Sequence, residues 1–397
     1  MFTMHYKRLL TLIDSVSSYL SVGLDVGADF TWMSIALPNG SFIGKPFKIV
    51  HSDPRSRDLA VAKIKEAQET YSLKSRCFLE STGIYHIPLL CFLRDKGFDC
   101  SVINPIITKN STNINIRKLH NDKFDSKKAA LVGLNVSLKT SIIPDDSVVD
   151  LRNLVRDYYY FKDLQSAVAL KLTAELKVSF PAYAKVFSKV TTQSSLKLLS
   201  SYPLAEDMLA ASKDDIVKII RSTARFGEAY ALRKYDTIIA AAQDAAVFGR
   251  ALPSNAVRIR LYIDTYQEYQ KHLDALLKAL HETVERLQDT LIYDQICLLQ
   301  SLRGIGFLSA IVLIAEMGDF KLFSSPKKLY AYFGLDPAVK QSGKLNGDKV
   351  HMSKRGSSLA RRVLHMVALN NVKVDKGSGT PVNPVVYDLS LIHISEP

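Results

Sequence analysis

The chain has 397 residues, 47% of them hydrophobic, which is enough for two or three domains with buried cores and excludes a chain that is disordered throughout. Its formal net charge of +13 favours a polyanionic partner, either nucleic acid or an anionic membrane surface. The strongest apolar run, Ala310 to Ala315, falls far short of the roughly 20 residues of a membrane span, so we expect a cytoplasmic protein without a membrane partner.

The N-terminal part of the chain alternates short strands with helices. Strands are predicted at residues 21–27, 31–37, 41–50, 77–80 and 100–104. Helices are predicted at residues 57–71 and 88–96, and a third begins near Asp122. Pro38-Asn39-Gly40 is a strong turn signal between the second and third strands. The order β-β-β-α-β-α-β-α is that of an RNase H-like α/β fold with a mixed sheet.

Four acidic residues lie where such a fold can gather them. Asp25 and Glu80 are at the carboxyl ends of two predicted strands, which face a common crevice in a sheet of this kind. Asp122 and Asp125 are three residues apart at the head of a helix, so their carboxylates project from one face. Acidic residues also stabilise an ordinary helix start. The spacing alone therefore leaves both a metal site and a helix cap open.

The middle of the chain is helical. Apolar residues recur at steps of three and four from Leu151, and Pro181 closes that segment. Shorter helices are expected at residues 190–250. Residues 259–291 then alternate apolar steps of four and three without a break, with Gln270 as a polar register mark, which is typical of a coiled-coil seam. We expect this helix to pair with a second copy of the chain; packing within its own chain is the alternative.

The C-terminal region combines glycine turns with basic residues. Two apolar helical segments joined through Gly304-Ile305-Gly306 resemble a helix-hairpin-helix, in which glycine amides approach a DNA phosphate; a plain helical turn is the alternative. Single basic residues usually belong to a solvated surface, but clustering around glycine loops in a basic chain favours phosphate contacts. The candidate nucleic-acid-binding residues are Arg303, Gly304, Gly306, Lys354, Arg355, Arg361 and Arg362.

Changes in composition divide the chain into five segments. They are an extension at residues 1–20, an α/β domain at 21–135, a helical linker and coiled coil at 136–292, a C-terminal helical domain at 293–390 and a tail at 391–397 that resembles a translated sequencing adaptor. The cysteines are scattered and form no C-x-x-C pair, so we expect reduced thiols rather than zinc ligands or disulfides. They are Cys77, Cys91, Cys100 and Cys297.

Three acidic motifs resemble those of the RuvC-like DEDD transposases of insertion sequences, the IS110 family, which also contains Piv-type DNA invertases. The motifs are Gly23–Gly27, Leu79–Gly83 and Asn121–Lys128. Residues 302–362 are similar to the second characteristic region of that family. Ser126 stands where the family usually has alanine, and Arg303 where many relatives have proline. The resemblance implies a RuvC-like domain at residues 21–135 and a transposase domain at 293–390.

The resemblance also implies the chemistry. Asp25, Glu80, Asp122 and Asp125 would together hold Mg²⁺, with two ions expected, in agreement with the preference of hard divalent ions for carboxylate oxygens. Ser342, in Gln341-Ser342-Gly343, would attack DNA and form a covalent phosphoserine. No histidine or lysine is an obvious local base, so activation by metal is expected. Without the family, Ser342 is simply a turn serine before glycine.

The partners implied by the resemblance are donor and target DNA, a structured bridge RNA that pairs with both, and a homo-oligomer in which dimers pair into a tetramer through the coiled coil. The protein would associate with the bacterial nucleoid when acting.

Other interpretations remain open. The segment around Asp25 also suits the phosphate loop of actin-like ATPases and sugar kinases, although no second such loop is found. A Holliday-junction resolvase has the same acidic set without the C-terminal block. A Piv-type invertase and a non-enzymatic coiled-coil nucleic-acid scaffold are the remaining alternatives.

Overall fold

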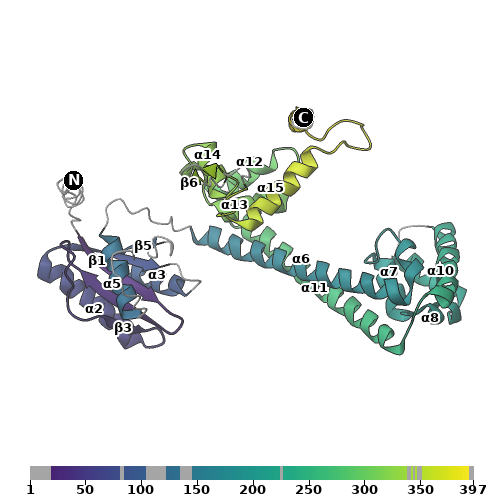
Figure 1. The fold of residues 1–397 in the computed structure, drawn as a ribbon, viewed down its shortest axis with the longest axis horizontal. Helices are drawn as coiled ribbons and strands as arrows, with labels where there is room; N and C mark the ends of the chain where they lie inside the picture. Colours follow the sequence, from purple (N-terminus) through teal and green to yellow (C-terminus); the bar gives the residue numbers. More distant parts are fainter. Residues whose placement is uncertain are drawn as a thin grey trace. The chain divides into compact units, whose positions relative to one another are not determined.

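The structure is a computed structural model. It describes residues 19–80, 85–103, 122–134, 145–223, 227–337, 341–342, 345–346 and 351–392. The chain divides into two compact units, one up to Ile143 and one from Pro144 onwards. Each unit buries its own apolar side chains. Figure 1 shows the helices and strands of both units.

The first unit is built on one mixed five-stranded sheet. Its strands are β1 Tyr19–Val26, β2 Phe30–Ala36, β3 Phe47–Val50, β4 Lys74–Glu80 and β5 Asp99–Ile103. The spatial order is β3-β2-β1-β4-β5, with antiparallel pairing from β1 through β3 and parallel pairing of β1 with β4 and of β4 with β5. With α2 Pro54–Tyr71, α3 His86–Asp95 and α5 Asp122–Gly133, the element order confirms the predicted one. The predicted third strand is shorter than expected, because only Phe47–Val50 pairs continuously with β2, and the first half of the prediction contributes a single isolated bridge between Phe42 and Ala36.

Alternation along β1 explains the layers of this unit. Leu20, Val22 and Leu24 are buried in a core that also contains side chains of α2 and α3. The intervening Ser21 and Gly23 face α5 instead, since their nearest neighbours are residues of that helix. The sheet is therefore covered on both faces, as the RNase H-like order predicts.

The second unit is helical, and its axis is a pair of long antiparallel helices, α6 Asp146–Ser179 and α11 Pro253–Glu285 (Figure 1). Contacts progress in opposite directions along the two helices: Glu175 accepts from Asn255, and Gln165 donates to Gln270 at 2.8 Å. At one end, a core is closed by shorter elements. They are η2 Pro181–Lys185, α7 Gln193–Ser201, α8 Ala205–Ala210, α9 Lys213–Thr223 and α10 Glu228–Phe248.

At the other end, Leu151 and Val155 of α6 share a core with Leu280 and Val284 of α11 and with the C-terminal elements. These elements are α12 Leu291–Gln300, α13 Phe307–Met317, η3 Phe320–Leu322, α14 Pro326–Tyr332, β6 Gln341–Ser342, β7 Leu345–Asn346, α15 Ser358–Asn371 and α16 Pro384–Ile392. Every residue of α13 from Ala310 to Met317 is buried, which explains the strong apolar run in the sequence. Among the described residues, none of the helices is both long and apolar enough to cross a bilayer.

The expected coiled-coil seam has a partner inside the chain. Ile259, Ile263, Leu273 and Leu280 are buried, and α11 packs along α6. The uninterrupted helix predicted to Leu291 is wrong, because α11 ends at Glu285 and a new helix, α12, begins at Leu291. Residues 1–18 of the predicted N-terminal extension and the last residues of the predicted tail lie outside the described residues. The last two residues predicted for the extension, 19–20, belong to β1 instead.

Candidate active site

Asp25 and Glu80 lie side by side on the adjacent strands β1 and β4, at the edge of the sheet where these parallel strands end. The parallel pairing of β1 and β4 joins Leu24 with Leu79, and each acidic residue is the next one on its strand. Glu80 is the last residue of β4, and Asp25 is the penultimate residue of β1. Both acids therefore stand at carboxyl ends of adjacent parallel strands, as the sequence predicted.

Helix α5 runs back along β1 and carries the other two acids toward this edge. Near the start of β1, the Tyr19 hydroxyl donates to the carbonyl of Gly133 at 2.7 Å, and Ser21 donates to Ala130 at 2.6 Å. Farther along β1, a Cβ added at Gly23 would lie 2.2 Å from the carbonyl oxygen of Ser126. Each step toward the amino end of α5 thus matches a step toward the carboxyl end of β1.

The first turn of α5 contains Asp122 and Asp125, which this progression brings to the level of Asp25. The helix is held in place by a buried hydrogen bond between the hydroxyls of Ser126 and Ser34 at 2.8 Å. Ser126, which stands where the family usually has alanine, therefore joins α5 to β2 through its side chain. Asp122 is exposed and Asp125 is half-buried.

The electrostatics of Asp25 report how closely the four acids lie. The pKa of its carboxyl is raised from 3.8 to about 7. Burial is the largest cause, and the negative charges of Asp125, Asp122 and Glu80 add to it. Like charges raise a carboxyl pKa only when they are near enough to oppose its ionisation. The four acids named from the sequence thus form one electrostatic group.

Lysine 128 is the counter-charge of this group, and sequence analysis did not single it out. Its Nζ lies 3.5 Å from a carboxylate oxygen of Asp125, and both side chains are largely buried. Its charge lowers the pKa of Asp25, against the effect of the acids. The signal was present in the spacing: a cation three residues after Asp125 on a helix falls on the same face.

The only tryptophan of the chain lies beside the same group. Trp32 is the β2 partner of Asp25 in the antiparallel register. Lys123, between the two acids of α5, has its Nζ 4.7 Å from the centre of the tryptophan ring. We therefore expect the fluorescence of Trp32 to respond to changes of charge at this site.

The donor set fits a hard divalent cation by its chemistry. Four carboxylates supply the oxygen ligands that Mg²⁺ prefers, and the raised pKa of Asp25 shows a local excess of negative charge that a cation would relieve. Among the described residues, however, no three histidine, cysteine, aspartate or glutamate side chains are grouped tightly enough to hold a metal ion. The acids are coupled electrostatically without forming a closed coordination shell.

Ser342 belongs to the second unit, on a small hairpin. It is in β6, paired with Leu345 of β7, and an isolated bridge between Pro337 and Met352 closes the base of this segment. The orientation of the Ser342 side chain lies outside what the structure describes. Its role as a nucleophile stays a prediction.

The glycine turn between α12 and α13 differs from a simple phosphate loop. Gly304 has a φ of +83°, and a Cβ there would lie 2.2 Å from the side-chain amide nitrogen (Nδ2) of Asn371 on α15. Its lack of a side chain therefore serves internal packing. Gly306 and Arg303 are exposed, and among the described atoms a Cβ at Gly306 would meet nothing within 4 Å.

The basic residues of the C-terminal region fall into two groups. Lys354 and Arg355 are exposed in the loop before α15. Arg361 instead donates to the backbone carbonyls of Phe333 and Gly356, at 2.9 and 2.6 Å, so its guanidinium holds the fold together. Arg362 lies on the surface, where it pairs with Asp163 of α6 at 2.8 Å.

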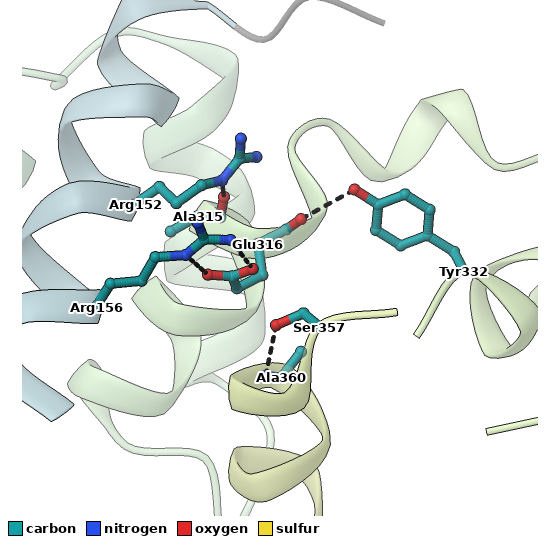
Figure 2. Close-up of polar contacts among 7 residues, drawn as sticks. All are labelled: Arg152, Arg156, Ala315, Glu316, Tyr332, Ser357 and Ala360. Carbon is teal, nitrogen blue, oxygen red and sulfur yellow. Dashed lines mark hydrogen bonds and ion pairs between the residues drawn. The ribbon is translucent and has the colours of Figure 1, made fainter. Parts of the chain in front are cut away.

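A buried carboxylate that sequence analysis passed over connects α6 with the C-terminal helices (Figure 2). Glu316 accepts two hydrogen bonds from Arg156, at 2.8 and 2.9 Å, while Arg152 donates to the carbonyl of Ala315 at 2.7 Å. Burial acts to raise the pKa of Glu316, but the bonds and charge of Arg156, aided by Ser357 and Arg152, outweigh burial and lower it. The sequence signal for this buried carboxylate was a single acidic residue within an otherwise apolar helix.

Comparison with known proteins identifies the two ends of the chain. Residues 22–181 match the family model for the DEDD domain of IS110-type proteins, described as "Transposase". Residues 297–381 match the model described as "Transposase IS116/IS110/IS902 family". The first match extends into the helical middle as far as Pro181, and the two matches together cover more than half of the chain.

One curated relative, "Putative transposase y4qE" of Sinorhizobium fredii, is 29% identical over 121 residues, a segment that is 29% of this chain and 31% of the relative. The matched segment is thus about a third of that relative. Both models describe transposases of one family, one matching the N-terminal part of the chain and the other the C-terminal part. The chain therefore belongs to the IS110 family of transposases.

Proposed function

We propose that the chain is a DNA transposase of an insertion sequence, which cleaves and exchanges DNA strands with the help of a divalent metal ion. The observation that carries the proposal is the group of four acids that includes Asp25, whose pKa is raised to about 7 by burial and, in addition, by the charges of the other three. A site that accumulates negative charge in this way is suited to a cation and, through it, to a phosphodiester. The match of residues 297–381 favours a transposase over a Holliday-junction resolvase.

Asp25, Glu80, Asp122 and Asp125 would hold Mg²⁺, which when bound supplies positive charge at the DNA phosphate. The strand ends fix the first two carboxylates, while α5 presents the other two from its first turn. Lys128 holds Asp125 on the face that also bears Asp122. The residues of this chain would thus bind and orient the cation from two strands and one helix.

Ser342 is our proposed nucleophile. Its oxygen would bond to a DNA phosphorus as the ester oxygen of the broken strand leaves as a hydroxyl, producing a phosphoserine. What supports this is the family resemblance of Gln341-Ser342-Gly343 together with its place in β6, which pairs with β7. A serine needs activation to react, and a bound metal ion is the proposed source.

The RNA partner and the oligomer are also part of the proposal. The net charge of +13 suits DNA and a structured bridge RNA equally. Because α11 uses its apolar seam on α6, pairing of chains would involve the outward side of these helices, where Leu170, Val257 and Leu261 are exposed. Dimers and tetramers of this kind would be seen as concentration-dependent mass in solution.

The test uses the full chain, its RNA and a supercoiled plasmid that carries the element ends. We expect Mg²⁺-dependent strand exchange that Asp25→Asn and Asp125→Asn abolish and that Asp29→Asn, an exposed acid beyond β1, leaves unchanged. Denaturing gels should show a covalent protein–DNA adduct that Ser342→Ala loses. Strand exchange that persists in Asp25→Asn would refute the metal site, and an adduct in Ser342→Ala would refute the nucleophile.

Metal binding has a readout that does not depend on activity. Tb³⁺ is a luminescent substitute for hard divalent cations, and Trp32 lies beside the acidic group where it can sensitise the ion. We expect saturable Tb³⁺ emission on excitation of Trp32, with competition by Mg²⁺ and loss in Asp25→Asn. Emission that is unchanged in that variant would mean that the ion binds elsewhere.

A further inference from the structure

An open cleft of about 560 Å³ lies between α6 and the start of α15 in the second unit. Four residues from each side line it: Arg156, Tyr159, Tyr160 and Asp163 of α6, and Ser357, Ser358, Leu359 and Arg362 from the other wall. The spacing on α6 follows one helical face. The cleft is far from the acidic site in sequence and is used by none of the steps proposed above.

The walls of the cleft are fixed by the buried Glu316 (Figure 2). Its carboxylate accepts from Arg156 on the α6 side. On the other side, the hydroxyl of Ser357 caps α15 by accepting from the amide of Ala360, and it acts to lower the pKa of Glu316. The side chain of Glu316 is 3% exposed, whereas that of Arg156 is 58% exposed. One buried acid thus anchors both walls and leaves part of an arginine at the surface.

The charges of the cleft favour an anion. Arg156 binds the carboxylate of Glu316, and Arg152, which donates to the carbonyl of Ala315, is a second cation near the same single acid; the excess of positive charge favours an anion near this wall. Arg362 lies over the ring of Tyr159, 5.0 Å from its centre, and pairs with the exposed Asp163. An exposed pair of this kind is worth little in water and can be exchanged for a phosphate. The N-terminal turn of α15 adds the positive end of a helix dipole.

The aromatic residues favour an unpaired base. Tyr160 is 60% exposed, and its ring packs edge-to-face against Phe161. An exposed ring held in this way is a stacking surface for any nucleobase. A cleft of this size suits a strand whose bases are free, since paired bases cannot present their faces.

We propose that this cleft binds a single-stranded segment of nucleic acid, with one base stacked on Tyr160 and a phosphate held by Arg362 at the start of α15. The proposal rests on the nucleic-acid-processing function proposed above and names a strand contact outside the acidic site. DNA and RNA share the chemistry on which it depends. An acidic peptide would use the arginine but would gain nothing from the exposed ring.

The test is fluorescence anisotropy of labelled oligo(dT) and oligo(U), about 12 nucleotides long, with the full chain over a series of salt concentrations. Tyr160→Ala should weaken binding about tenfold with an unchanged salt slope. Arg362→Gln should weaken binding and reduce the salt slope by about one. Asp163→Asn should strengthen binding, because it frees Arg362 for the phosphate.

Tyr71→Ala is the matched control, since Tyr71 is an exposed tyrosine of the first unit. It should leave the affinity unchanged, and thermal unfolding of each variant checks the fold. If the parent binds both oligonucleotides and none of the three cleft variants differs from it, the cleft is refuted while the proposed function stands. If the parent binds neither oligonucleotide, the proposed nucleic-acid-processing function itself is refuted. A larger loss in Tyr160→Ala for one of the two oligonucleotides identifies which strand the cleft takes.

Discussion

The ionisation of Asp25 is strongly affected by its surroundings, and this has a consequence for stability. Its pKa is 3.8 ordinarily and about 7 in the folded protein. A raised pKa means that the folded state keeps a proton that the unfolded state has lost, so this group contributes stability fully below pH 3.8 and loses that contribution as the pH rises through 7. Above that pH the charged carboxylate opposes folding of the metal-free protein.

We therefore expect Asp25→Asn to make the metal-free first unit more stable than the parent near pH 8. Asp25 is only partly buried and water screens it, so the gain should be about 1–2 kcal/mol. Urea unfolding followed through Trp32 measures it, and the gap should shrink near pH 5. Adding Mg²⁺ near pH 8 should stabilise only the parent. A gap that does not change with pH would rule out the coupling.

A second prediction at this scale concerns Lys128, whose charge lowers the pKa of Asp25. Lys128→Met should move the pH midpoint of the Trp32 fluorescence change upward, because one cation near the acids is removed. Lys127→Met is the matched control, since Lys127 lies over the ring of Phe42 at 4.9 Å rather than against Asp125. Equal midpoints in the two variants would mean that Lys128 does not act on the acidic group.

The positions of the four acids were predictable from sequence because strand ends and helix starts have local signals. The partners of other residues were not. Arg361 and Gly304 resemble phosphate contacts in sequence, yet Arg361 binds carbonyls of its own chain and Gly304 makes room for Asn371. A guanidinium satisfies a phosphate and a backbone carbonyl equally well, so residue type alone does not separate the two roles.

At the scale of elements, the acidic site depends on how closely α5 approaches β1. Gly23 makes this possible, since a Cβ there would lie 2.2 Å from both the carbonyl of Ser126 and the amide nitrogen of Ala130. These atoms are backbone, so the helix as a whole must move to accommodate a side chain. Such a shift would carry Asp122 and Asp125 away from the strand ends.

Gly23→Ala should therefore lower the stability of the first unit by about 2–3 kcal/mol, as overpacking of a tight contact does. It should also bring the pKa of Asp25 down toward its ordinary value and weaken Tb³⁺ emission sensitised by Trp32. Gly227→Ala, where a Cβ would meet no described atom within 4 Å, is the control for the same chemical change. Normal emission from a destabilised Gly23→Ala protein would separate the packing role from the site.

The sheet and the long helices show what sequence patterns can and cannot predict. The order of strands and helices along the chain was predictable because its signals, such as the turn at Pro38–Gly40, are local. The partner of α11 was not, because a seam of steps of three and four specifies an apolar stripe and not the helix that covers it. Here α6 covers it, through the Gln165–Gln270 amide pair and the buried Glu175.

At the scale of the whole molecule, the chain has two compact units: the first has one hydrophobic core and the second has two, at opposite ends of the α6–α11 pair. Units that share no apolar cluster can unfold as separate cooperative transitions. Calorimetry of the full metal-free chain should therefore show more than one transition. Single substitutions placed in one unit should shift only the transitions of that unit.

Glu316→Gln assigns these transitions, because Glu316 joins α13 to α6 within the second unit. Losing its charge should weaken the bonds from Arg156 and lower the stability of that unit by about 1.5–3 kcal/mol. Since the pKa of Glu316 is lowered in the folded state, its contribution is present above its unfolded pKa and is lost as the pH falls through the folded one. The difference between variant and parent should accordingly fade in acid. Gly23→Ala should shift the other transition and leave this one in place. A single transition moved by both variants would mean that the two units fold as one.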